Sequence, residues 1–190
     1  MKKDYDNFQH WKDEEIAHKI VVDKEQELFK VIYQRYKPKI QDKVYGFIKD
    51  RNKSEEFTND ILSRIYEKMP GFKGHSTFSS WVYSITYNYC IDYLRLKKKL
   101  HYPEWNKNNM IPEIPDESEE DLSGVSYEKL LKILDMIHPE EKALILMKYQ
   151  DDLSLKQIAT TLRISEDAVK MRLKRARTRI VFYYKHHFQD

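Results

Sequence analysis

Residues 154–177 read SLKQIATTLRISEDAVKMRLKRAR, a stretch that predicts two short helices joined by a tight turn. Ser154 is followed three residues later by Gln157, which makes a capping box: the hydroxyl accepts a hydrogen bond from a helical N–H, and the amide reaches back to the cap. Ser165 is placed to cap the second helix. Arg163 lies in the turn, where many such motifs place a glycine in a left-handed conformation. The stretch therefore predicts a helix-turn-helix.

The second of these helices is strongly basic. Its cationic residues are Lys170, Arg172, Lys174, Arg175, Arg177 and Arg179. The apolar residues that predict its buried side are Val169, Leu173, Ala176 and Ile180. Such a helix suits the DNA major groove, where its N-terminal half reaches base edges and flanking cations neutralise phosphates. A plain helical hairpin with a solvated basic face is the other interpretation, but no acidic residue lies between positions 170 and 179 to form i,i+4 pairs.

A second stretch, residues 72–99, reads FKGHSTFSSWVYSITYNYCIDYLRLKKK and predicts a long helix. A helical wheel places one apolar side at Phe78, Val82, Ile85, Tyr89, Tyr93 and Leu96. The neighbouring strip contains Trp81, Ser84, Asn88 and Arg95, and three lysines follow. Aromatic rings stack on unpaired bases, amides bind base edges and lysines hold phosphates, so the strip suits single-stranded or melting DNA. The other interpretation is an aromatic core stripe, with lysines that favour any helix C-terminus.

The charge of the chain is distributed unevenly along its 190 residues. The formal net charge of +3 combines +5 over residues 1–100, −6 over residues 101–125 and +4 over residues 126–190. The middle segment holds three of the six prolines and lacks helical periodicity, so it predicts a linker. Two interpretations of its acidity stay open: a solvated tether, or an acidic segment that mimics nucleic acid inside a basic channel.

Apolar residues at helical spacing occur on both sides of this segment. In the first part of the chain they are Leu28, Ile32 and Tyr36, then Phe57, Ile61, Ile65 and Met69. No stretch alternates with period two, and only four glycines are present, so we expect an all-α protein of two small helical domains, near 15–100 and 126–186.

Several classes of protein are disfavoured by what the sequence lacks. The single Cys90 excludes an intramolecular disulfide and a cysteine zinc site. The seven histidines are scattered and no carboxylates cluster at ligand spacing, so we expect no cofactor and no enzymatic activity. No apolar run approaches the roughly 18 residues of a membrane span and no signal-peptide core is visible, so we expect a cytoplasmic protein.

At residues 72–95 and 154–177 the sequence resembles the extracytoplasmic-function (ECF) class of bacterial sigma factors, of the sigma-70 family. The first family pattern, F-x-G-x-S-[ST]-F-x-x-W-[LV]-[YF]-x-I-A-x-N-x-x-I-D-x-L-R, is reproduced with Thr86 in place of alanine. The second, roughly S-x-x-E-I-A-x-x-L-G-x-S-x-x-T-V-K-x-R-L-x-R-A-R, is reproduced with three departures. These are Gln157 for glutamate, Arg163 for glycine and Ala168 for threonine.

The resemblance implies a promoter-specificity subunit of RNA polymerase. Residues 1–100 would form region 2, which docks on the β′ clamp of the core enzyme and melts the −10 element. Residues 126–190 would form region 4, which reads the −35 element and touches the β flap. Residues 101–125 would thread toward the RNA exit channel, which favours the mimicry interpretation of the acidic linker. Many members of the family are held inactive by an anti-sigma factor, which is therefore a further partner to consider.

The resemblance also implies which residues act. For the −10 element these are the loop residues Lys73, Gly74, His75, Ser76 and Thr77, then Trp81, Ser84, Asn88, Arg95, Lys97, Lys98 and Lys99. For the −35 element they are Glu166, Asp167, Lys170, Met171, Arg172, Lys174 and Arg175. For polymerase they are Asp60, Ile61, Ser63 and Arg64. The family pattern here is usually D-L-x-Q-E-x-F, and this chain has Ser63 and Arg64 in place of the glutamine and the glutamate, so Arg64 reverses a charge.

Two other classes of function remain as alternatives. A stand-alone helix-turn-helix regulator would use residues 126–190 on duplex DNA, and the aromatic helix would be plain core. A DNA-acting enzyme such as a metal nuclease would need a ligand cluster that the sequence does not display.

Overall fold

The computed structural model describes residues 8, 10–98, 106 and 126–188, and every regular element in these ranges is a helix. The all-α fold predicted from the sequence is thereby confirmed. Residue contacts divide the chain into two compact units, Met1–Cys90 and Ile91–Asp190. The division falls inside helix α4 (Phe78–Lys98), so the C-terminal part of α4 belongs with the second unit. Apart from Asn106, the predicted acidic linker lies outside the described residues.

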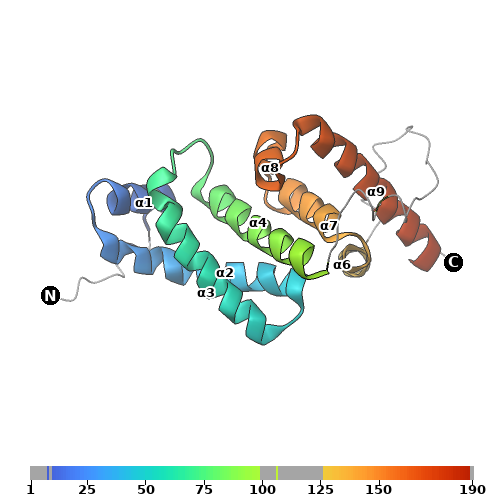
Figure 1. Ribbon diagram of the computed structural model, residues 1–190, viewed down its shortest axis with the longest axis horizontal. Coiled ribbons are helices and arrows are strands. Elements are labelled where there is room, and N and C mark those ends of the chain that lie inside the picture. The colour runs from blue at the N-terminus through green and yellow to red at the C-terminus, as the bar shows by residue number, and fades with distance from the viewer. Residues whose placement is uncertain (1–7, 9, 99–105, 107–125, 189–190) are drawn as a thin grey trace. The chain divides into compact units, whose positions relative to one another are not determined.

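The first unit is built around an antiparallel helical hairpin (Figure 1). Its elements are α1 (Asp13–Val21), a 3₁₀ turn (Gln26–Leu28), α2 (Phe29–Ile48), α3 (Arg51–Lys68), a second 3₁₀ turn (Met69–Gly71) and the start of α4. Lys49, the residue after α2, caps the helix in the left-handed conformation with φ 56°. Asp50 then caps α3 by accepting a hydrogen bond of 3.1 Å from the N–H of Lys53. The chain reverses there, and α2 and α3 pack side by side.

The apolar residues that the spacing predicted form the core of this hairpin. All seven are buried: Leu28, Ile32, Tyr36, Phe57, Ile61, Ile65 and Met69. Two hydrogen bonds fix the start of α4, one from another helix and one from its own cap. The carboxylate of Glu14 on α1 accepts a hydrogen bond of 2.8 Å from the N–H of Phe78. The hydroxyl of Thr77 accepts one of 3.2 Å from the N–H of Ser80.

Helix α4 buries a different side from the one predicted. Its buried residues are Phe78, Ser80, Val82, Thr86, Tyr87, Cys90, Ile91 and Leu94. The prediction was wrong for Leu96, which is 83% exposed, and Ile85, Tyr89 and Tyr93 are only half-buried. At 100° per residue, a row of residues four apart drifts by about 40° at each step, so the buried row winds around the helix. A single side of a wheel therefore describes only the first turns.

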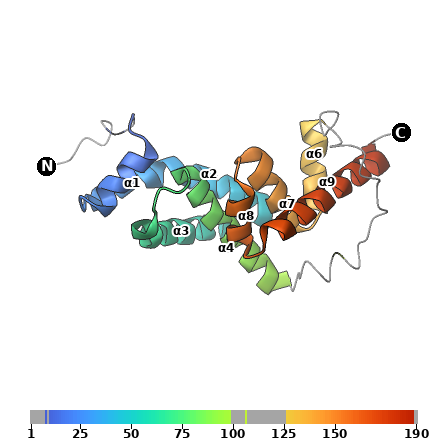
Figure 2. The same ribbon diagram turned by 90° about the horizontal axis from the view of Figure 1, so that it is seen from above.

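The second unit packs three short helices against one long one (Figure 2). Its elements are α6 (Tyr127–Met136), α7 (Pro139–Ile145), a π turn (Leu146–Gln150), α8 (Leu155–Leu162) and α9 (Glu166–Phe188). The predicted stripe of α9, which is Val169, Leu173, Ala176 and Ile180, is buried. Apolar residues of α6, α7 and α8, such as Ile133, Leu144 and Ile158, complete this core.

A buried ion pair crosses the core of the second unit. The Arg179 side chain is 2% exposed and the Glu141 side chain 0%, and Nε of Arg179 lies 3.1 Å from Oε2 of Glu141. Arg179 also donates a hydrogen bond of 3.0 Å to the amide oxygen of Asn106. The expectation that Arg179 contributes to the solvated basic face was therefore wrong. Its acidic partner comes from α7, far along the sequence.

Candidate nucleic-acid interface

The loop between α3 and α4 presents polar groups to solvent. Lys73, Gly74 and His75 are exposed, and Gly74 has φ +70°, a conformation that strains a residue with a side chain. The hydroxyl of Ser76 donates a hydrogen bond of 3.2 Å to the carbonyl oxygen of Thr77. Because Thr77 itself caps α4, the loop is fixed at its C-terminal end and exposed at its centre.

An aromatic cluster lies directly after this loop. The ring centroids of Phe72 and Phe78 are 5.3 Å apart, those of Phe72 and Trp81 are 5.3 Å apart, and those of Phe78 and Trp81 are 5.5 Å apart. Phe78 is fully buried, whereas Phe72 and Trp81 are half-buried. The core interpretation of the aromatic stripe is therefore correct for Phe78, whereas the base-stacking interpretation of Trp81 stays a prediction. Phe78 belongs to the core, and the indole of Trp81 is a supported, partly open ring on which a base can stack.

The remaining polar residues of the predicted strip are also half-buried on α4. Ser84 donates a hydrogen bond of 2.9 Å to the carbonyl oxygen of Ser80, so its hydroxyl is tied to its own helix. Asn88 lies two turns beyond Trp81 on the same strip. Lys97 and Lys98 belong to α4, but their side chains and all of Lys99 lie outside the described residues.

The residues predicted to contact polymerase separate into two groups. Asp60, Ser63 and Arg64 are exposed on α3, whereas Ile61 is fully buried and packs in the core. Ser63 lines an open hollow of about 700 Å³ between the start of α2 and α3. The other lining residues include the aromatic side chains Phe29, Tyr33 and Tyr66.

Arg64 is held by Tyr89, a residue that the sequence assigned to the core. The hydroxyl of Tyr89 donates a hydrogen bond of 2.7 Å to the carboxylate of Asp60, and the guanidinium of Arg64 lies 4.6 Å from the centre of the Tyr89 ring. Burial, together with the hydrogen bond to Asp60, raises the pKa of Tyr89 to about 12, so the phenol stays protonated and keeps donating. The stacked Arg64 is an internal partner of α4. No spacing signal links α3 to Tyr89.

The helix-turn-helix has the local geometry that its sequence predicted. Ser154 and Gln157 form the capping box, with the hydroxyl of Ser154 accepting from the N–H of Gln157 at 3.3 Å. The hydroxyl of Ser165 accepts a hydrogen bond of 3.1 Å from the N–H of Ala168 at the start of α9. Arg163 adopts the left-handed conformation, with φ 58° and ψ 46°. That conformation costs a residue other than glycine roughly 1 kcal/mol or more.

Most of the residues predicted to read DNA are exposed on the first half of α9. These are Glu166, Asp167, Lys170, Met171, Lys174 and Arg175. Lys170 forms an ion pair of 3.3 Å with Asp167. Arg172 differs, because its side chain is 15% exposed and its Nη1 lies 2.5 Å from Oε2 of Glu140 on α7. Arg172 therefore ties α9 to α7.

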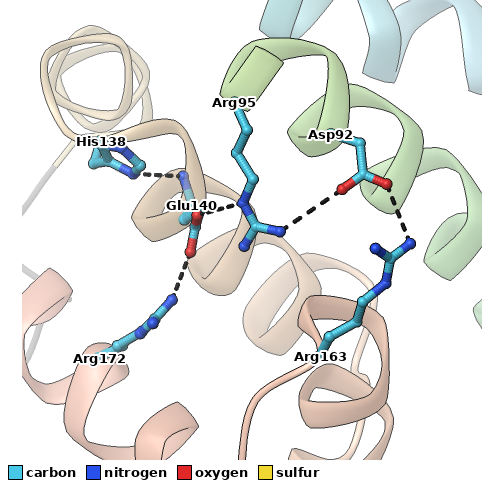
Figure 3. A network of polar contacts seen from close by, with 6 residues as sticks. All are labelled: Asp92, Arg95, His138, Glu140, Arg163 and Arg172. Carbon is cyan, nitrogen blue, oxygen red and sulfur yellow. Dashed lines mark hydrogen bonds and ion pairs between the residues drawn. The ribbon is translucent and has the colours of Figure 1, made fainter. Parts of the chain in front are cut away.

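Glu140 is the centre of a chain of alternating charges within the second unit (Figure 3). Its Oε1 accepts from Nε of Arg95 at 2.8 Å, while Nη1 of Arg95 lies 3.7 Å from Oδ1 of Asp92. The other carboxylate oxygen of Asp92 lies 3.2 Å from Nη2 of Arg163. Five side chains, from Arg163 to Arg172, are thus connected. Sequence reasoning missed Glu140 and Asp92, because no pattern in the sequence shows that α4, α7 and the turn at Arg163 lie close together.

His138 fixes the backbone of Glu140 at the start of α7. Its Nδ1 accepts a hydrogen bond of 3.1 Å from the N–H of Glu140 and so caps α7. Burial lowers the pKa of His138 to about 4, so the ring is neutral near pH 7 and keeps an acceptor for this bond.

No helix in the described ranges is both long and apolar enough to cross a membrane. Within the same ranges, no group of three histidine, cysteine, aspartate or glutamate side chains could hold a metal ion.

Comparisons with known proteins match both units. Residues 32–100 match the family model described as Sigma-70 region 2, and residues 127–180 match the one described as Sigma-70, region 4. The chain is 30% identical over 167 residues to the ECF RNA polymerase sigma factor SigW of Bacillus subtilis strain 168. This match covers 80% of this chain and 87% of SigW.

Two solved structures have a similar fold. One is the sigma factor RpoE in complex with the anti-sigma factor NepR from Bartonella quintana, with a TM-score of 0.56, 18% identity, and coverage of 83% of this chain and 96% of that one. The other is CnrH in complex with the cytosolic domain of CnrY, with a TM-score of 0.61, 14% identity, and coverage of 92% and 98%.

Proposed function

The chain belongs to the sigma-70 family, in the ECF class of promoter-specificity subunits of RNA polymerase, and we propose that the surfaces described above recognise the −10 and −35 elements. The observation that carries this proposal is the supported indole of Trp81, which follows an exposed loop and leads into the strip with Asn88. A ring of that kind captures an unstacked base, and the loop residues 73–77 would surround it.

The −35 element would be read by the first half of α9. Glu166, Lys170 and Lys174 are exposed there and are spaced to face one side of the helix. Side chains at the start of such a helix reach base edges, and the basic residues that follow hold phosphates. Arg172 acts differently in this proposal, since its guanidinium positions α9 by its bond to Glu140.

Core RNA polymerase would bind the exposed residues of α3. Asp60 offers a carboxylate oriented by Tyr89, and Ser63 lies at the rim of the aromatic hollow. The chain would act in the cytoplasm, where the core enzyme works, and without catalysis of its own, because nucleotide polymerisation belongs to the core enzyme. RpoE was solved with an anti-sigma factor, and an inhibitor of this kind is a further partner that we propose for this chain.

Run-off transcription with reconstituted core polymerase and genomic promoter fragments tests this function. Wild-type protein should direct initiation at discrete start sites, and Trp81→Ala and Asn88→Ala should lose open complexes while still binding core polymerase. Tyr45→Ala is a matched control, because Tyr45 is an aromatic residue of the same unit that is 42% exposed and lies outside the proposed sites. Failure to initiate from any promoter would refute the function, and full activity of Trp81→Ala would refute the base-stacking role.

A further inference from the structure

Arg163 ends helix α8 in a strained, left-handed backbone conformation, and the need to end the helix does not explain why this position carries arginine rather than glycine. The residue has φ 58°, where glycine is free of strain, and its side chain is 65% exposed. Because the side chain is mostly exposed, its packing contributes little free energy to offset the backbone strain. Strained residues persist where the surrounding structure uses them, so the contact that Arg163 makes is a guide to its role. That contact is the ion pair of 3.2 Å with Asp92 near the end of α4.

Glu140 makes a second connection to the same end of α4. Its carboxylate is 3% exposed and is held by Arg172, whereas the Arg95 side chain that it binds is 28% exposed. A carboxylate presented in this way occupies the guanidinium of Arg95 as a phosphate oxygen would. Arg95 cannot donate the same N–H groups to Glu140 and to DNA, so binding of DNA by Arg95 requires that this bond break (Figure 3).

We propose that Arg163 and Glu140 form a latch on the end of α4 that masks Arg95 from nucleic acid. In the latched state, Asp92 is paired with Arg163 and Arg95 is paired with Glu140. Single-stranded DNA competes for Arg95 and binds tightly only to chains in which the latch is open. This inference rests on the proposed function, since the role of Arg95 in strand binding comes from it.

The size of the effect follows from the exposure of the pair. Partly exposed ion pairs of this kind shift an equilibrium by about 1.5- to 5-fold. While the latched state predominates, the affinity for DNA scales with the open fraction. Removing Arg163 should therefore tighten binding of single-stranded DNA by about 1.5- to 5-fold, although the variant has fewer positive charges.

Four proteins test the latch by fluorescence anisotropy with a fluorescein-labelled, mixed-sequence single-stranded oligonucleotide at one salt concentration. They are the wild type, Arg163→Gly, Arg163→Glu and the control Lys156→Glu. Lys156 is exposed on α8, and its change alters the net charge as much as Arg163→Glu does. Both Arg163 variants should bind more tightly than wild type, and Lys156→Glu should bind no more tightly. Glycine suits the left-handed position, so Arg163→Gly is expected to fold.

The dependence on Arg95 completes the test. In an Arg95→Ala background, Arg163→Gly should bring no further gain, because the residue that the latch masks is absent. Weaker or unchanged binding by both Arg163 variants, or a gain that persists without Arg95, would overturn the latch. Run-off transcription by the same proteins separates a failure of the proposed function from a failure of the latch. If none of them initiates with core polymerase, the proposed function fails, whereas the anisotropy series decides the latch independently.

Discussion

Replacing Arg179 with methionine should destabilise the second unit far more than a surface substitution does. The change removes the guanidinium but leaves the carboxylate of Glu141 in a core where it is 0% exposed. Breaking a buried ion pair from one side costs about 3–5 kcal/mol, because the remaining charge is buried without its partner. Since small domains unfold with only about 5–15 kcal/mol, Arg179→Met should bring this unit close to unfolding.

The matched control is Arg177→Met on the same helix. Arg177 is only half-buried, and the contact it makes is a hydrogen bond of 3.5 Å to the hydroxyl of Tyr149. Such a residue should contribute less than about 1 kcal/mol. A double variant, Glu141→Leu with Arg179→Met, removes both charges and should recover most of the loss, because apolar replacements of buried pairs are often neutral or stabilising.

Urea unfolding followed by circular dichroism at 222 nm measures these differences. Hydrogen exchange with mass spectrometry assigns them to a unit, because peptides from α9 should lose protection while peptides from α3 keep theirs. If Arg179→Met proved no more destabilising than Arg177→Met, the buried pair would not stabilise the core as reasoned. A double variant no more stable than Arg179→Met alone would contradict the account of the uncompensated charge.

Three further predictions concern the second unit. The pKa of His138 is lowered from 6.5 to about 4, so its contribution to stability is present above pH 6.5 and is lost as the pH falls toward 4. His138→Asn keeps a side-chain acceptor for the start of α7 but does not titrate in this range. Between pH 7 and pH 5 it should therefore lose about 2 kcal/mol less unfolding free energy than the wild type does. Equal shifts of the urea midpoint in the variant and the wild type would contradict this. Ser154→Ala should cost about 1 kcal/mol of unfolding free energy, against a negligible change for Thr160→Ala on the exposed side of α8; equal costs would argue against the cap. Lys174→Ala should lower the salt slope of duplex binding by about 1 in filter-binding titrations, and an unchanged slope would remove its phosphate contact.

The helix-turn-helix was predictable because its signals are local. A capping box lies within four residues, and the left-handed turn residue follows directly from where the helix must end. The periodicity of the buried residues of α9 is equally local, and all four predicted core positions are buried. The family resemblance rested on these stretches, and the match to the sigma-70 models and to SigW confirms it.

Contacts between distant segments were beyond sequence reasoning. The count of basic residues in α9 treated Arg172 and Arg179 as surface charges, whereas acidic residues of α7 neutralise both. The buried side of α4 was misjudged for another reason, since its buried row winds around the helix and one side of a helical wheel does not describe it. Tyr89 was placed in the core on the same grounds, and its bond to Asp60 could be found only once α3 and α4 were positioned.

The buried Cys90 is a built-in probe of how often the core around it opens. The chain has one cysteine, and burial raises the pKa of its thiol to about 12, so the folded state presents almost no reactive thiolate. Modification by a thiol reagent must wait until the helices around Cys90 separate. The labelling rate therefore reports how often this part of the core opens, without any engineered probe. Cysteines introduced at exposed positions would react much faster, so dyes can be attached there selectively in the native protein.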